Sequence, residues 1–183
     1  MRVTSVFCAV LLWMASTTAA QTTSVGPWQP RPSIGVGVGR LSASETSATW
    51  KGLISGTLEI PITDNGRFRV EAGRSSFPMP YGANNSLWGR TARLSRITVG
   101  GAGLIRPGAP VSPYVGFSFG AYRLSLDGTG GVMTSGGHLY GGAEIMGSDH
   151  LSINAELGLH LIDRNPFNEK LFAEATLRIK VGL

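Results

Sequence analysis

The carboxyl-terminal stretch Leu171–Leu183, LFAEATLRIKVGL, alternates between apolar and mostly polar residues along its whole length. One phase holds Leu, Ala, Ala, Leu, Ile, Val and Leu, and the other holds Phe, Glu, Thr, Arg, Lys and Gly. A period of two places these sets on opposite faces of an extended strand. The stretch is also long enough to cross a bilayer, which takes about 9–11 tilted strand residues. It therefore predicts a long β-strand with one apolar and one polar face.

The same alternation recurs upstream and predicts strands at 34–39, 50–62, 67–74, 90–106, 113–126, 137–146 and 151–161. The turn at 63–66 contains Asn-Gly, which is typical of hairpin turns because it allows a positive φ. Keeping both flanking apolar sets on one face requires an odd number of loop residues, so we expect a bulge there. Connections after the second, fourth and sixth strands are short, and the others are generally longer. Eight strands with alternating loop lengths indicate an outer-membrane type of barrel.

Composition supports a lipid-facing sheet. Charged residues make up 15% of the chain, against about 25% in an average soluble domain, and glycine is abundant at 26 of 183 residues. The net charge of +5 comes without a Lys/Arg run or a basic-aromatic motif, so we expect no nucleic-acid binding. The single cysteine, Cys8, lies in the amino-terminal segment, which excludes a disulfide or a thiolate metal site in the remainder.

Three segments are expected along the chain. Residues 1–20 have a positive start, an apolar run and small residues at the end, as in a secretory signal peptide cleaved after Ala20. Residues 21–33 form a proline-containing lead-in, and residues 34–183 form the barrel domain. The signal predicts export of the protein.

Alternation alone does not decide which face of the barrel is inside, because a soluble lipocalin-like barrel also alternates, with its apolar face inward. Here the polar face carries both signs of charge and is rich in Gly and Ser, which suits a crowded interior. Charges in a low-dielectric lumen must pair, and Glu59 and Arg69 can pair across the second hairpin. The predicted lumen charge network consists of Glu59, Arg67, Arg69, Glu71, Arg96, Glu144, Glu156, Glu174, Arg178 and Lys180.

The stretch Pro113–Ala121, PYVGFSFGA, resembles a central strand of the small OmpA/OmpX-like outer-membrane barrels. The signal segment, the strand count and the terminal strand agree, so the resemblance covers nearly the whole mature chain, although such families usually end in an aromatic residue and this chain ends in Leu183. The resemblance implies an all-β, eight-stranded antiparallel up-and-down transmembrane β-barrel in a bacterial outer membrane. It implies outer-membrane lipid and lipopolysaccharide as surroundings, the barrel-assembly machinery as partner during insertion, and a monomer.

An eight-stranded barrel has an interior just wide enough for side chains. We therefore expect a structural, surface-interaction or minor solute-passage role without a cofactor. The best binding candidates are Phe77, Tyr81 and Trp88, which lie in the long loop expected at 75–89. Aromatic residues on an outward loop can bind a partner or lipopolysaccharide. The alternative interpretation is a loop that folds over the barrel mouth or lies on the membrane interface.

An enzymatic alternative starts from His150-Leu151-Ser152, which resembles the His-x-Ser of outer-membrane lipid A deacylases, with Asn154 and Glu156 nearby. These residue types supply a nucleophile, a base and an orienting group. In the predicted topology, however, His150 follows a periplasmic turn, whereas a deacylase needs its site near the outer leaflet. Three scattered histidines without cysteine also do not predict a metal site, and we expect His138 and His160 to form hydrogen bonds in the lumen. The sequence thus predicts neither a catalytic nor a metal site.

Overall fold

The computed structural model describes residues 31–43, 51–78, 91–126, 130–148, 150–163 and 171–183. These residues form eight antiparallel strands that close into one barrel, because β1 pairs with both β2 and β8. The eight strands are β1 Ser33–Ala43, β2 Lys51–Pro61, β3 Gly66–Pro78, β4 Thr91–Leu104, β5 Val111–Leu126, β6 Gly131–Met146, β7 Leu151–Ile162 and β8 Leu171–Gly182. The up-and-down barrel predicted from the sequence is confirmed. No helix long and apolar enough to span a membrane occurs among the described residues.

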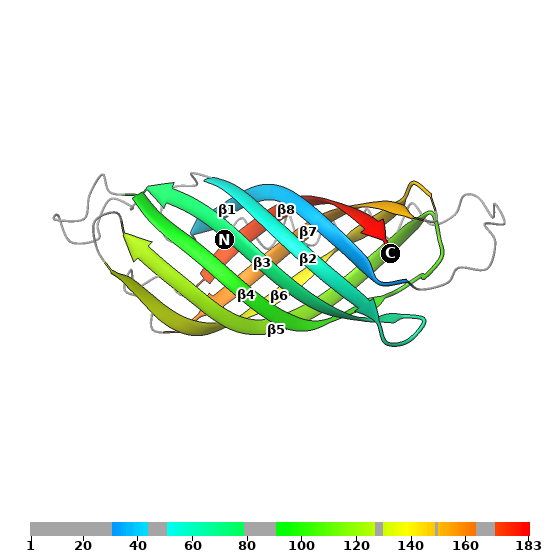
Figure 1. Ribbon diagram of the computed structural model, residues 1–183, viewed down its shortest axis with the longest axis horizontal. Helices are drawn as coiled ribbons and strands as arrows, with labels where there is room; N and C mark the ends of the chain where they lie inside the picture. The colour runs from blue at the N-terminus through cyan, green and yellow to red at the C-terminus, as the bar shows by residue number, and fades with distance from the viewer. Residues whose placement is uncertain (1–30, 44–50, 79–90, 127–129, 149, 164–170) are drawn as a thin grey trace, which may run out of the picture.

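The barrel has two distinct ends. The β2–β3, β4–β5 and β6–β7 turns lie at one end, here called the turn end, where β1 begins and β8 finishes. The other end, here called the loop end, is where β1, β3, β5 and β7 finish. In Figure 1 the turn end lies at the right of the view and bears both the β2–β3 turn and the carboxyl terminus. The signal peptide expected at 1–20 and nearly all of the lead-in expected at 21–33 lie outside the described residues.

Several strands extend further toward the loop end than the sequence predicted. β1 continues to Ala43, β3 continues to Pro78, and β6 begins at Gly131 rather than at residue 137. The ladder continues in these segments because each residue has a partner, as Gly131 has in Ser125. Their Gly, Ser and Pro content is typical of loops, which is why they were predicted as such. The prediction of a long loop at 127–136 is therefore wrong, because only residues 127–130 connect β5 to β6.

The β2–β3 turn contains the expected bulge but not the expected backbone angle. The amides of Ile62 and Thr63 both donate to the Gly66 carbonyl, at 2.9 and 3.2 Å, so two residues oppose one. Among the described glycines only Gly108 has a positive φ, of 79°. Gly66 instead serves close packing, because a Cβ there would lie 2.7 Å from Thr63 Oγ1, the atom that accepts the Gly66 amide hydrogen bond.

The apolar face lies outside the barrel and the charged face lies inside. Val36 and Phe119 are 64% and 63% exposed, whereas Arg178 is 0% exposed. A water-soluble lipocalin-like barrel would have the opposite arrangement. The outward apolar surface is the kind that a membrane-spanning barrel presents to lipid.

Candidate functional site in the barrel lumen

The structure places all ten charged residues of the expected network inside the barrel, where they contact one another. Successive members such as Arg67, Arg69 and Glu71 stand two residues apart on β3, so the period of the strand turns each of them inward. The set contains five carboxylates and five basic side chains, so its formal charge is zero. This balance is what a low-dielectric interior requires.

Four of these residues form a closed ring of ion pairs near the turn end, here called the turn-end ring. Arg67 lies 3.1 Å from Glu59 and 2.8 Å from Glu144. Lys180 lies 2.7 Å from Glu59 and 3.0 Å from Glu144. Each acid therefore contacts both bases and each base contacts both acids, which leaves the ring neutral.

A second ring, here called the central ring, lies further inside. Arg69 lies 2.6 Å from Glu71 and 2.5 Å from Glu156, and Arg178 lies 3.2 Å from both acids. All four side chains are almost completely buried. The pairing expected between Glu59 and Arg69 exists in the register of the hairpin, but the atoms are 4.0 Å apart, so the stronger contacts of Arg69 lie within the central ring.

Tyrosines from β5 and β6 pack against the central ring. The Tyr114 hydroxyl donates a hydrogen bond of 2.9 Å to Glu156, and the guanidinium of Arg69 lies 4.4 Å from the ring centroid of Tyr140. The small residue Gly116 makes room for Tyr140, because a Cβ there would lie 2.5 Å from the tyrosine ring. These contacts fill the lumen around the charged groups.

Arg96 and Glu174 extend the network toward the loop end. Arg96 lies 2.5 Å from Glu71 and 2.6 Å from Glu174. Glu174 also contacts His160 Nε2 at 2.8 Å and accepts a hydrogen bond of 2.6 Å from Thr176. Nδ1 of His160 lies 3.0 Å from the Tyr122 hydroxyl. A neutral imidazole satisfies both neighbours when Nε2 donates to Glu174 and Nδ1 accepts from Tyr122.

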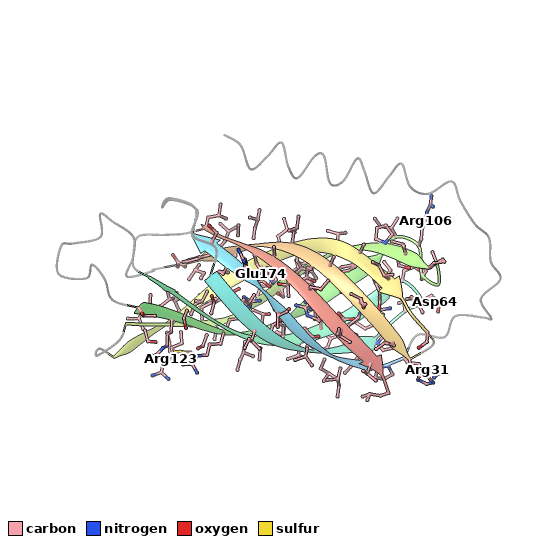
Figure 2. The ribbon with its side chains drawn as sticks, turned by 90° about the horizontal axis from the view of Figure 1, so that it is seen from above. Arg31, Asp64, Arg106, Arg123 and Glu174 are labelled. Carbon is pink, nitrogen blue, oxygen red and sulfur yellow. The ribbon has the colours of Figure 1, made fainter. Side chains whose placement is uncertain are left out.

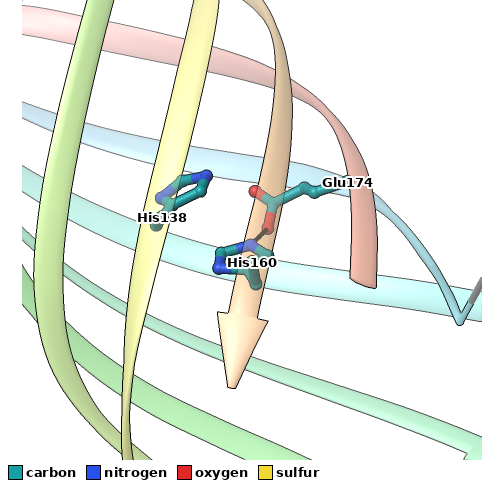
Figure 3. Close-up of side chains that lie close together, drawn as sticks. All are labelled: His138, His160 and Glu174. Atoms are coloured by element: carbon teal, nitrogen blue, oxygen red, sulfur yellow. Dashed lines mark hydrogen bonds and ion pairs between the residues drawn. The ribbon is translucent and has the colours of Figure 1, made fainter. Parts of the chain in front are cut away.

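His138, His160 and Glu174 are brought together in the lumen, as Figure 3 shows. The imidazoles stack with their centroids 3.9 Å apart, and one donor atom from each of the three residues lies within 4.8 Å of the others. Two imidazoles and a carboxylate are ligands that divalent transition metals accept. Both oxygens of Glu174 already contact Arg96, His160 or Thr176, so a cation there would have to displace these groups.

An apolar layer, here called the apolar plug, closes the loop end of the lumen and was not predicted. Its seven buried residues are Leu41, Ala92, Leu94, Tyr122, Leu124, Ile162 and Phe172. They occupy the inward phase near the loop ends of their strands, so the sequence signal was an apolar residue in an otherwise polar phase, as Phe172 is in β8. From the turn end inward, the lumen thus contains two neutral rings, the layer of Arg96, Glu174 and the two histidines, and then the apolar plug.

The two main residues of the enzymatic alternative, His150 and Ser152, line one small pocket at the turn end but contact different partners there. The Ser152 hydroxyl donates a 2.7 Å hydrogen bond to Glu144, and the His150 ring lies 3.2 Å from Arg31 outside the lumen. Asn154 contacts the Tyr114 hydroxyl at 3.5 Å, and Glu156 belongs to the central ring. The expected loop binders Tyr81 and Trp88 lie outside the described residues. Phe77 lies in β3 rather than in the expected loop, because its backbone pairs with Ala92, and its side chain is not described.

Comparisons with known proteins identify the fold. No family model matches the chain, and no curated protein matches its sequence. Among solved structures, Neisserial surface protein A is 18% identical with a TM-score of 0.64, over 83% of this chain and 96% of that one. A major outer membrane protein from Thermus thermophilus is 12% identical with a TM-score of 0.55, over 84% and 98% of the two chains. The N-terminal β-barrel domain of Pseudomonas aeruginosa OprF is 12% identical with a TM-score of 0.53, over 83% and 99%. The chain has the fold of the small eight-stranded outer-membrane barrels.

Proposed function

We propose that this protein is a bacterial outer-membrane barrel with a closed lumen and a structural or surface-interaction role. It is exported through a cleaved signal peptide, inserted by the barrel-assembly machinery and surrounded as a monomer by outer-membrane lipid and lipopolysaccharide. The observation that carries this proposal is the filling of the lumen by two neutral ion-pair rings and the apolar plug. Any passage of solutes is minor.

The closed lumen follows from the energetics of its contents. An ion that crosses it must pass between paired charges that are almost completely buried and then through the apolar plug. Breaking a buried ion pair costs about 3–5 kcal/mol. The apolar plug could replace the hydration of an ion only through the Tyr122 hydroxyl, which already contacts His160. Conduction therefore requires rearrangement of several layers at once.

A non-enzymatic role agrees with the contacts of the candidate catalytic residues. A nucleophilic serine needs a base within hydrogen-bond reach. Ser152 instead donates to Glu144, whose other contacts are Arg67 and Lys180. This carboxylate is held in the turn-end ring and Ser152 stabilises it there. A lipid-modifying activity remains the alternative that the Ser152 experiment in the Discussion tests.

Membrane fractionation combined with gel mobility tests the membrane barrel. We expect the protein in the outer-membrane fraction, with a band that migrates differently before and after boiling because the closed barrel resists detergent. A soluble periplasmic or secreted protein would overturn the proposal. Planar bilayer recording then tests the closed lumen, with an open porin as positive control. Frequent, large conductance steps from the purified barrel would contradict it.

A further inference from the structure

The membrane-facing surface carries charge at only one end. Among strand residues whose side chains are described, the charged ones that point outward are all arginines, and each lies within four residues of the loop end of its strand. They are Arg40, Arg74, Arg93 and Arg123. Figure 2 shows Arg123 pointing away from the barrel at the left, opposite the end that bears Arg31, Asp64 and Arg106.

Three of these arginines surround one serine on adjacent strands. Ser95 on β4 pairs with Arg74 on β3 and with Arg123 on β5, so the two arginines stand about 10 Å apart across three strands. Arg93 lies on the same face of β4, two residues closer to the loop end. We call Arg74, Arg93, Arg123 and Ser95 the arginine cluster. Its side chains are long enough to face one ligand that spans the three strands.

The environment of the arginine cluster favours the binding of an anion. Among the described residues, neither Arg74 nor Arg123 has an ion-pair partner, whereas the basic residues of the lumen are all paired. A cation on the lipid face is costly unless it reaches the interface. Arg123 extends toward the interface at the loop end. Its Nε lies 2.7 Å from the position that a Cβ of Gly131 would occupy. Gly131 pairs with Ser125, which is two residues nearer the loop end than Arg123.

An apolar surface lies directly beside the cluster, toward the middle of the barrel. Ile97, Phe117 and Phe119 are 61%, 58% and 63% exposed on β4 and β5. Acyl chains fit this surface, and an anionic headgroup at the membrane interface fits the arginines beside it. The arginines therefore match the anionic headgroup of a lipid and the apolar surface matches its acyl chains, in the same order from the loop end toward the middle of the barrel.

We propose that the arginine cluster binds the phosphate groups of a bisphosphorylated glucosamine lipid, the lipid A class, in the leaflet at the loop end. Guanidinium groups bind phosphate oxygens in bidentate geometry, and the Ser95 hydroxyl adds a donor at the centre. A spread of about 10 Å across three strands suits a headgroup with two phosphates better than one with a single phosphate. The proposal rests on the proposed outer-membrane location and specifies the lipid contact.

Native mass spectrometry of the detergent-folded protein tests this site. The probes are bisphosphorylated lipid A, the same lipid without its phosphates, and phosphatidylglycerol. The test variant is R74S/R123S, and the matched control is R31S/R106S, which loses the same charge at the turn end. We expect wild type and control to retain one bisphosphorylated lipid, and the test variant to bind it about tenfold more weakly.

Three outcomes would overturn the proposal: equal binding by the test variant, equal loss in the control variant, or equal retention of the lipid without phosphates. Retention of phosphatidylglycerol as strong as that of lipid A would overturn the two-phosphate headgroup. The boiled and unheated gel is run on every variant. A protein that shows the mobility shift but no lipid preference contradicts only the lipid site, whereas absence of the shift in wild type contradicts the proposed function itself.

Discussion

The guanidinium of Arg69 on β3 lies 2.5 Å from the carboxylate of Glu156 on β7, four strands away around the eight-stranded barrel. This ion pair crosses the full width of the lumen and connects opposite walls. Each partner also contacts Arg178 or Glu71 within the central ring. The interior is therefore held together by contacts between residues that are distant in sequence, and the strand ladder alone does not specify them.

Replacing Glu156 with glutamine should destabilise the barrel strongly. The substitution leaves Arg69 and Arg178 with one fewer carboxylate in a buried site, which costs about 3–5 kcal/mol. The free energy of unfolding in guanidinium chloride, measured for the protein folded into lipid vesicles, gives the value. R106Q at the exposed turn end is the control and should stay within about 0.5 kcal/mol of wild type. A loss for E156Q no larger than the control's would mean that the central ring is not a stabilising unit.

The two lumen histidines should differ in importance even though their rings stack. His160→Leu leaves the Tyr122 hydroxyl without its hydrogen-bond partner and removes one of the contacts of Glu174, so we expect a loss of about 1–3 kcal/mol. His138→Leu removes a ring whose nitrogens have no hydrogen-bond partner among the described residues, and we expect a smaller loss. Thermal unfolding monitored by circular dichroism compares the two variants. Equal losses would show that stacking, rather than the hydrogen bonds of His160, holds this layer.

The sequence predicted the barrel well because period-two alternation reports the two faces directly. It predicted β7 and β8 to within about a residue because Leu151–Ile162 and Leu171–Gly182 alternate without interruption. It misplaced the loop ends of β3 and β6, where backbone pairing continues through Ser, Gly and Pro. Strand pairing there is determined by the neighbouring strands rather than by local propensity.

The lumen was predictable as a set of residues but not as a geometry. Inward phase and charge sign identify Arg69, Glu71 and Glu156 as lumen residues. The division into two neutral rings depends on the register between strands and on the shape of each side chain, which no local pattern contains. The apolar plug was not predicted, because residues such as Phe172 and Leu94 come from strands far apart in the sequence and meet only when the barrel closes.

Truncating a residue of the apolar plug should cost more than truncating an aromatic residue on the outside. Phe172→Ala leaves a cavity among buried neighbours such as Leu41 and Leu94, and we expect a loss of about 3–5 kcal/mol. Phe117→Ala removes a ring that is 58% exposed on the membrane-facing surface, where lipid can fill the space. The free energy of unfolding of both variants in the same vesicles tests this. A larger loss for Phe117→Ala would mean that the plug is loosely packed.

Replacing Ser152 should leave membrane lipid chemistry unchanged. The Ser152 hydroxyl donates to Glu144 in the turn-end ring, while His150 contacts Arg31, so the two residues do not form a nucleophile and base pair. We expect mass spectra of lipid A to show the same acyl chains in cells that express wild type, S152A or no protein. Loss of an acyl chain with wild type and its restoration with S152A would instead establish a deacylase. The S152A barrel should still shift its gel mobility on boiling, because losing one hydrogen bond costs only about 1 kcal/mol, and this control ensures that unchanged acylation is read from a folded protein.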